Sequence, residues 1–226
     1  MMKIPISYDD IHLDVPGDQG IYVPAEDTFL LLDLVKRFLE DNALIVKEND
    51  LPVLDMGTGS GIVSLLLSRY FAQVHAIDVN PNAIEFVRAE IGKRGLSCKY
   101  SLLNSSLTDS FNASRDAPLY FLACFNPPYL PKEHDNDDLN EITTNEDYLK
   151  HALYSSPDGA SVLKNFLTRL KDFLKPGGHV FFVFSSLSSE NTLEEMINNL
   201  DYALKEKTKI HRFFEDIYAC HIQKRQ

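Results

Sequence analysis

The stretch Val53-Leu54-Asp55-Met56-Gly57-Thr58-Gly59-Ser60-Gly61 decides the fold that this sequence predicts. The apolar residues 51–56 read as a buried strand, and residues 61–70 have the spacing of a helix. The glycines between them let the backbone turn sharply and pass close to a ligand that a Cβ atom would push away. A strand, a glycine-rich turn and a helix in this order predict a cofactor site beyond the carboxyl end of a parallel strand.

Apolar runs alternate with helical segments along the rest of the chain, as in a parallel sheet covered by helices on both faces. The predicted strands after the first are 74–78, 98–103, 119–125 and 179–185. The predicted helices are 29–39, 61–70, 81 to about 93, 161–174 and 193–204, and Asp27 or Thr28 is expected to cap the first of them. Pro176-Gly177-Gly178 is expected to stop the helix 161–174. Two short strands, 208–214 and 216–222, are expected to close the sheet.

The composition is that of an ordinary globular protein. The 226 residues fit one core, with 44% hydrophobic and 24% charged residues. We expect one domain over 1–226, made of a covering segment and helix at 1–40, a cofactor-binding core at 51–185, and a C-terminal helix with closing strands at 186–226. No apolar run approaches the roughly 20 residues of a membrane span. The first residues lack the apolar region of a signal peptide, so we expect a cytoplasmic protein without membrane contact.

The net charge and the arrangement of cysteine and histidine residues argue against direct nucleic-acid binding and against a metal site. The formal net charge is −11 and the basic residues are dispersed, whereas a protein that docks by itself on phosphate backbones usually carries a basic patch. Direct nucleic-acid binding is therefore not expected. The three cysteines lack CxxC spacing and the seven histidines form no cluster, so no metal site is expected either.

Two acidic residues favour one cofactor over another. Asp78 ends the second predicted strand and is placed to accept the hydroxyls of a ribose, which both nicotinamide and S-adenosylmethionine carry. Asp55, just before the first glycine, suits a ligand with a positively charged amino-acid end and would repel a pyrophosphate. The spacing GxGxG also differs from the GxGxxG of dinucleotide sites. S-adenosyl-L-methionine is therefore the expected cofactor, with nicotinamide as the alternative.

Asn126-Pro127-Pro128-Tyr129 directly follows an apolar run and suits the methylation of a planar nitrogen. The side-chain oxygen of Asn126 and the carbonyl of Pro127 can each accept one hydrogen of an NH2 group, which directs the nitrogen lone pair at an electrophile. The prolines restrict the backbone and hold that carbonyl out towards a substrate. Tyr129 offers a flat face for stacking. Alone, this tetrapeptide would more often be a turn that ends a strand.

Four segments together carry a specific resemblance. They are Tyr22-Val23-Pro24-Ala25-Glu26-Asp27-Thr28, Asp55 to Gly61, Asp78-Val79-Asn80-Pro81 and Asn126 to Tyr129. Their combination resembles the HemK family of protein glutamine methyltransferases, and the segment 24–28 resembles its short eukaryotic and archaeal branch. The resemblance implies an α/β fold: one Rossmann-like class I methyltransferase domain with a mostly parallel, doubly wound seven-stranded sheet and an antiparallel C-terminal hairpin.

The resemblance also implies roles for individual residues. The expected catalytic residues are Asn126, Pro127, Pro128 and Tyr129. The expected cofactor-binding residues are Tyr22, Glu26, Thr28, Asp55, Gly57, Thr58, Gly59, Gly61, Asp78, Val79, Ser106, Leu107 and Asn126. The implied substrate is the glutamine of a Gly-Gly-Gln loop in a translation termination factor. The implied partner is a small zinc-binding activator protein that covers an edge of the sheet, for which strand 98–103 is the candidate.

The sequence departs from the family at one point. After the third strand the family usually carries an acidic residue followed by leucine, near the adenine amino group, whereas this chain has Asn104-Ser105-Ser106-Leu107. Ser106-Leu107 is the expected equivalent, because a hydroxyl can still accept a hydrogen bond. It lacks the charge that strengthens such a bond.

Other functions remain open at this point. The same tetrapeptide serves methyltransferases that act on exocyclic amines of RNA or DNA, and the acidic segment 131–147 could attract a lysine-rich tail. That segment reads either as a solvated loop or as a lid beside Tyr129. A non-catalytic scaffold is a further alternative, but a scaffold would need neither Asn126 nor the glycines.

Overall fold

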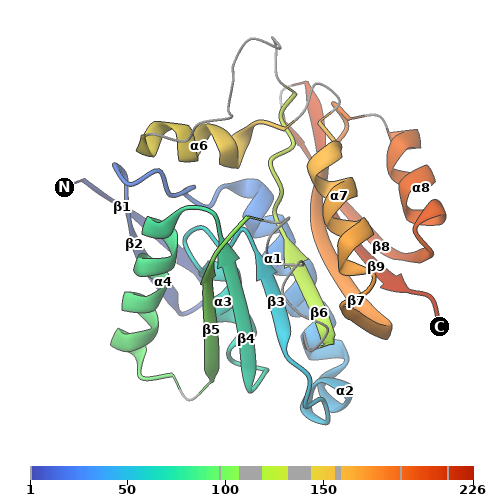
Figure 1. Cartoon of the computed structure of the whole chain (residues 1–226), viewed down its shortest axis with the longest axis horizontal. Helices are drawn as coiled ribbons and strands as arrows, with labels where there is room; N and C mark the ends of the chain where they lie inside the picture. The colour runs from blue at the N-terminus through green and yellow to red at the C-terminus, as the bar shows by residue number, and fades with distance from the viewer. Residues whose placement is uncertain are drawn as a thin grey trace.

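The computed structural model describes residues 2–96, 98–106, 119–131, 144–155, 159–188, 190–212 and 214–226. Its centre is a seven-stranded sheet in the order β5-β4-β3-β6-β7-β9-β8 (Figure 1). The strands are β3 Val53–Met56, β4 Gln73–Asp78, β5 Lys99–Asn104, β6 Tyr120–Phe125, β7 Leu174–Ser185, β8 Tyr202–Arg212 and β9 Glu215–Lys224. Neighbours from β5 to β7 pair in parallel, and β9 is antiparallel to both β7 and β8. The predicted seven-stranded sheet with its C-terminal hairpin is confirmed.

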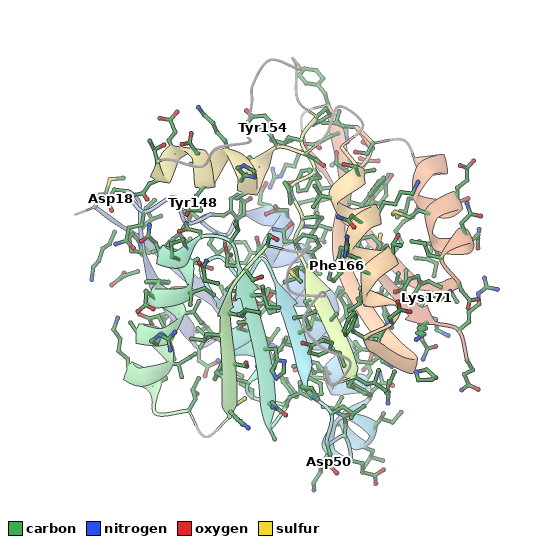
Figure 2. All side chains as sticks on the ribbon, viewed as in Figure 1. Asp18, Asp50, Tyr148, Tyr154, Phe166 and Lys171 are labelled. Atoms are coloured by element: carbon green, nitrogen blue, oxygen red, sulfur yellow. The ribbon has the colours of Figure 1, made fainter. Side chains whose placement is uncertain are left out.

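Helices cover both faces of the sheet. On one face lie α1 Glu26–Asp41, α3 Ile62–Leu67 and α4 Pro81–Arg94, and on the other α7 Ser161–Leu170 and α8 Glu190–Asn199. Successive residues of β7 sort onto the two faces, since Phe181 and Phe182 belong to different core clusters. Figure 2 labels Phe166 on α7, and the ring centroid of this residue lies 4.8 Å from that of Phe125 of β6. The central strands are therefore buried on both sides.

Several of the predicted boundaries are wrong, among them that of the closing strand 208–214, which is β8 and begins at Tyr202. Helix α7 ends at Leu170, and Pro176-Gly177-Gly178 lies inside β7 instead of stopping a helix. The strand accommodates these residues as an irregularity: Tyr120 of β6 pairs with Leu174, but Leu122 pairs with His179. Helix α8 ends at Asn199 and not at residue 204, because Asp201 takes a left-handed φ of 64°.

The start of α1 also differs from the prediction. The cap position is Ala25, which makes no side-chain cap hydrogen bond, and α1 begins at Glu26. Asp27 and Thr28 thus lie inside the first turn, and both are buried. Neither caps the helix, which leaves their polar groups available for contacts on other segments.

The structure adds elements that the sequence reading missed. The strands β1 Lys3–Tyr8 and β2 Ile11–Pro16 form a separate antiparallel hairpin. Its inner strand alternates buried and exposed residues, and the buried ones join the core on the α1 and α3 face. Two short helices, α2 Ala43–Lys47 and α6 Asn145–Leu153, were also missed. None of the described helices has the length and apolar character that crossing a membrane requires.

Helix α6 lies above the carboxyl ends of the central strands (Figure 1) and is attached at both ends. At its start, Asn145 Nδ2 donates to the Asp18 carbonyl at 2.8 Å, and Asn145 Oδ1 accepts from Asn82 Nδ2 at 3.0 Å. At its end, the Leu130 amide donates to the Leu153 carbonyl at 3.1 Å. Figure 2 shows Tyr148 and Tyr154 at this end of the molecule and Asp50 at the other. Helix α6, which overlaps the end of the acidic segment 131–147, therefore covers the end of the sheet where a ligand would bind.

The last glycine of the motif offers a stability test. Gly61 has a φ of +77°, and a Cβ there would meet Val87 Cγ2 at 2.6 Å. Gly61→Ala should therefore lower the free energy of unfolding by about 2 kcal/mol, since it adds left-handed strain to overpacking. Gly92 of α4 is the matched control, because its Cβ would meet nothing within 4 Å. Gly92→Ala should raise the same free energy by about 0.5–1 kcal/mol. Denaturant titration measures both, and equal effects of the two substitutions would contradict the packing argument.

Candidate active site

A cavity of about 190 Å³ lies at the carboxyl ends of β3, β4 and β6, beneath α6. It brings together most of the site residues that the sequence predicts. The predicted residues on its wall are Tyr22, Thr28, Asp55, Gly57, Thr58, Gly59, Asp78, Val79, Asn126, Pro127, Pro128 and Tyr129. Residues far apart in the chain thus share one site at the place where parallel sheets bind ligands.

The glycine turn forms the floor of the cavity and is tied to the neighbouring strand. Gly57 and Gly59 have φ values of 62° and 51°, in the left-handed region that favours glycine. The Gly59 amide donates to Asp78 Oδ2 at 2.8 Å, and the Thr58 amide donates to the Ile77 carbonyl at 2.9 Å. These bonds hold the turn beside the end of β4.

Asp55 is buried at the end of β3 and accepts three hydrogen bonds on one oxygen. The Thr58 hydroxyl, the Ser64 amide and the Ser64 hydroxyl all donate to Oδ2, at 2.7, 3.0 and 2.6 Å. Burial raises the pKa of Asp55 to about 6, although these hydrogen bonds act in the opposite direction. The other carboxylate oxygen is therefore the one left for a ligand, and a cationic group is the ligand that would stabilise its charge.

Asp78 adds a second carboxyl group at the end of β4. Its Oδ1 accepts from the Asn80 amide at 2.8 Å, while its Oδ2 is the partner of Gly59. Burial raises the pKa of this carboxyl group as well. Two acids on one wall, one buried and one partly buried, suit a positively charged ligand with hydroxyl groups and disfavour a pyrophosphate.

Asn126 follows β6, lines the cavity and carries a side-chain oxygen without a hydrogen-bond partner. Its Nδ2 donates to Asp27 Oδ2 at 3.1 Å and to Thr28 Oγ1 at 3.0 Å. Its Oδ1 is buried and has no hydrogen-bond partner in the structure. A buried acceptor without a partner is rare and costs free energy, so it marks a place for a donor from a ligand.

Three of the described residues that were predicted as contacts are not on the cavity wall. The carboxylate of Glu26 pairs with Arg212 of β8, which directs it to the rim. Gly61 faces Val87 of α4, and its role there is packing. Ser105 lines the cavity where Ser106 was expected, although both are described. Leu107 lies outside the described residues.

The structure also brings in residues that the sequence reading missed. Tyr148 and His151 line the cavity from α6, and Asp27 lines it from the first turn of α1. Only Asp27 lies in a segment that the resemblance had singled out. The rest of the acidic segment, 132–143, lies outside the described residues, while Glu146 and Asp147 belong to the first turn of α6 and not to a loop.

Comparisons with known proteins agree with this geometry. The family model described as "Methyltransferase domain" matches residues 26–218. The chain belongs to the methyltransferase domain family. It is 29% identical over 200 residues to a putative protein N5-glutamine methyltransferase of Methanocaldococcus jannaschii, covering 87% of this chain and 88% of that protein. It is 28% identical over 181 residues to a release factor glutamine methyltransferase of Rhodopirellula baltica, covering 77% of this chain and 57% of that one.

A solved structure shows the same fold. The Mtq2 chain of an E. cuniculi Mtq2-Trm112 complex, described as responsible for the methylation of the termination factor eRF1, superposes with a TM-score of 0.61. The identity is 21%, and the match covers 91% of this methyltransferase and 99% of the other chain. The two sequence relatives confirm the predicted resemblance to glutamine methyltransferases, and the solved structure confirms the fold.

Methyltransferases of this fold use S-adenosylmethionine, and the residues present in the cavity fit it. Asp55 would offer an oxygen to the ammonium group of the cofactor and Asp78 would accept from ribose hydroxyls, while the glycine turn would let the backbone pass close to the ligand. The described residues contain no group of three or more His, Cys, Asp or Glu side chains that could hold a metal. When bound, the cofactor supplies the methyl group.

The raised pKa of Asp55 predicts a pH dependence of cofactor binding. Above pH 6 this carboxyl group is ionised and attracts the cofactor ammonium, and below pH 6 it is protonated and does not. The affinity should therefore fall about tenfold from pH 7 to pH 5, as expected if only the ionised form binds. Asp55→Asn should weaken binding at pH 7 and flatten the profile. Isothermal calorimetry measures both, and an unchanged slope in Asp55→Asn would exclude this carboxyl group as the titrating one.

Proposed function

We propose that this methyltransferase transfers a methyl group from S-adenosylmethionine to the side-chain amide nitrogen of a glutamine, in the Gly-Gly-Gln motif of a translation termination factor. The observation that carries the proposal is the buried, unpartnered Oδ1 of Asn126, beside the proline carbonyl on the wall of the same cavity. These two acceptors match the two hydrogens of an amide NH2 group.

The arrangement orients a poor nucleophile. An amide nitrogen shares its lone pair with the carbonyl group, so it must be positioned and its developing positive charge stabilised during attack. Asn126 Oδ1 and the Pro127 carbonyl do this by accepting its hydrogens. Pro128 restricts the backbone at that carbonyl, and the half-buried ring of Tyr129 provides a flat wall for the planar amide. No side-chain base is required, because the nitrogen becomes acidic only once it is methylated and then loses its proton to water.

Relatives support glutamine over the other planar nitrogens. The two proteins compared above are named glutamine methyltransferases, and the E. cuniculi complex acts on a termination factor. An exocyclic amine of RNA or DNA offers the same two hydrogens, but the net charge of −11 disfavours unaided docking on nucleic acid. A lysine amine lacks the planar group that the Tyr129 ring would stack on, so we rank it lower.

An activator partner forms part of the proposal. Strand β5 is an edge of the sheet, and no described strand pairs with its outer side. Leu103 on this strand is 43% exposed. An unpaired edge with an exposed apolar side chain can accept a strand from another protein. We therefore propose β5 as the docking edge for a small zinc-binding subunit, with a cytoplasmic heterodimer as the active form.

Asn126→Ala tests the proposed catalytic role. Turnover should fall by about 10²-fold or more, the scale seen when one positioned hydrogen bond to a transition state is lost. Cofactor affinity measured by calorimetry should change little. Asn165→Ala, at an exposed position of α7, is the control and should leave both unchanged.

Labelled S-adenosylmethionine identifies the acceptor in that assay. The arms are a termination factor, the same factor with its Gly-Gly-Gln glutamine changed to alanine, a nucleic acid and a lysine-rich peptide. Incorporation of the labelled methyl group into the intact factor alone would support the proposal. Label in either of the last two arms, or in the alanine variant, would reject glutamine as the acceptor.

If the proposed zinc-binding subunit docks on β5, its binding should depend on the exposed side chains of that strand. Leu103→Lys should abolish co-purification with a zinc-binding subunit while leaving the fold unchanged by circular dichroism. Lys99→Glu, at the exposed start of the same strand, is the charge-change control. A purified chain that is monomeric and fully active alone would contradict the need for an activator.

A further inference from the structure

Asp27 collects the hydrogen bonds that hold the proposed acceptor site together. It is 3% exposed, in the first turn of α1. Its Oδ1 accepts from the Thr28 amide at 2.6 Å and the Thr28 hydroxyl at 3.2 Å. Its Oδ2 accepts from Asn126 Nδ2 and the Tyr129 hydroxyl, each at 3.1 Å, and the Tyr22 hydroxyl lies 3.0–3.1 Å from both oxygens. One carboxylate therefore joins the segment 22–28 to the loop after β6.

This network determines which way the Asn126 amide faces. One Nδ2 hydrogen points to the carboxylate of Asp27 and the other to Thr28 Oγ1, whose own hydrogen is directed to Asp27. Turning the amide over would set its oxygen against a carboxylate oxygen, so that two acceptors would meet without a proton between them. Both amide hydrogens are thus used inside the protein, and Oδ1 is left without a partner among the residues that the structure describes.

The same carboxylate turns the neighbouring hydroxyl hydrogens away from the cavity. Tyr22 and Tyr129 both donate to it, and burial together with its charge raises the pKa of each phenol, which keeps both protonated. What these groups present to a ligand is ring surface and oxygen lone pairs. The environment of Asn126 is therefore rich in acceptors and poor in donors.

We propose that Asp27 is a positioning residue that fixes the side-chain amide of Asn126 with its oxygen towards the substrate, and so selects a group that donates two hydrogens. The inference deepens the proposed function and rests on it for the identity of that group. The orientation of Asn126 itself depends only on the contacts of Asp27 and Thr28.

Of two substitutions of Asp27, the more conservative one, Asp27→Asn, should lower turnover more than Asp27→Ala. In Asp27→Asn, the Thr28 amide requires an acceptor at the Oδ1 position, so the new NH2 group takes the Oδ2 position and faces Asn126. Asn126 then turns over to accept from it and directs its own NH2 group into the cavity. In Asp27→Ala, the amide is free to rotate about the remaining Thr28 contact and still samples the productive orientation.

Turnover and cofactor affinity test this order. Asp27→Asn should lower turnover by about 10²-fold and Asp27→Ala by about tenfold, with cofactor affinity changed less than about threefold in both. A role in packing alone predicts the reverse, because alanine leaves a cavity and asparagine does not. Adding Asp27→Asn to Asn126→Ala should cause no further loss, because the residue acts through Asn126. Greater loss in Asp27→Ala, or losses that multiply in the double variant, would overturn the proposal.

Side-chain amide NMR supplies a readout that needs no substrate. The Nδ2 hydrogens of Asn126, assigned by their loss in Asn126→Ala, should exchange slowly in the wild-type protein and at least tenfold faster in Asp27→Asn, where they face the cavity. In Tyr129→Phe, which removes another hydrogen bond from the same carboxylate, that exchange should stay slow. Unchanged exchange in Asp27→Asn would refute the orientation argument even if glutamine methylation is established. Faster exchange would uphold it even if the true acceptor is another amine.

Discussion

The parallel pairing of β3 with both of its neighbours is the constraint on which the site depends. Met56 lies opposite Ile77 of β4 and opposite Phe125 of β6. The next residue of each strand end, Gly57, Asp78 or Asn126, therefore emerges at the same level of the sheet. A slip of one residue would exchange the two buried faces of β3, and would move one of these groups out of the cavity.

The sequence was most informative where local chemistry and tertiary structure agree. The glycine motif, the carboxylate that ends β4 and the tetrapeptide after β6 each lie at a strand end, and parallel strands bring such ends together. It misled at Pro176-Gly177-Gly178, a typical helix stop that instead lies inside β7 as an irregularity, between Leu174 and His179, which both pair with β6. Pairing across the sheet, which local propensity does not describe, decided that segment.

The remaining errors have a similar cause. Residues 202–204 continue a helical pattern, yet the buried Tyr202 donates its hydroxyl hydrogen to the Leu167 carbonyl and starts a strand. Asp27 looked like a helix cap because acidic residues favour that position, whereas two of its partners lie 99 and 102 residues further along the chain. No local pattern carries such contacts. The site residues could be predicted from motifs, but the network that orients them could not.

The attachment of residues 18–20 has a consequence for how the cavity forms during folding. Asn80 and Asn82, at the start of α4, hold the carbonyls of Gln19 and Gly20, and Asn145 of α6 holds that of Asp18. Three regions distant in the chain thus complete one wall. A ligand that binds this wall binds only chains in which all three have docked, and so stabilises the complete fold over partly folded forms. Binding of the cofactor at this wall would therefore favour the completely assembled fold, in addition to the chemical role of the cofactor.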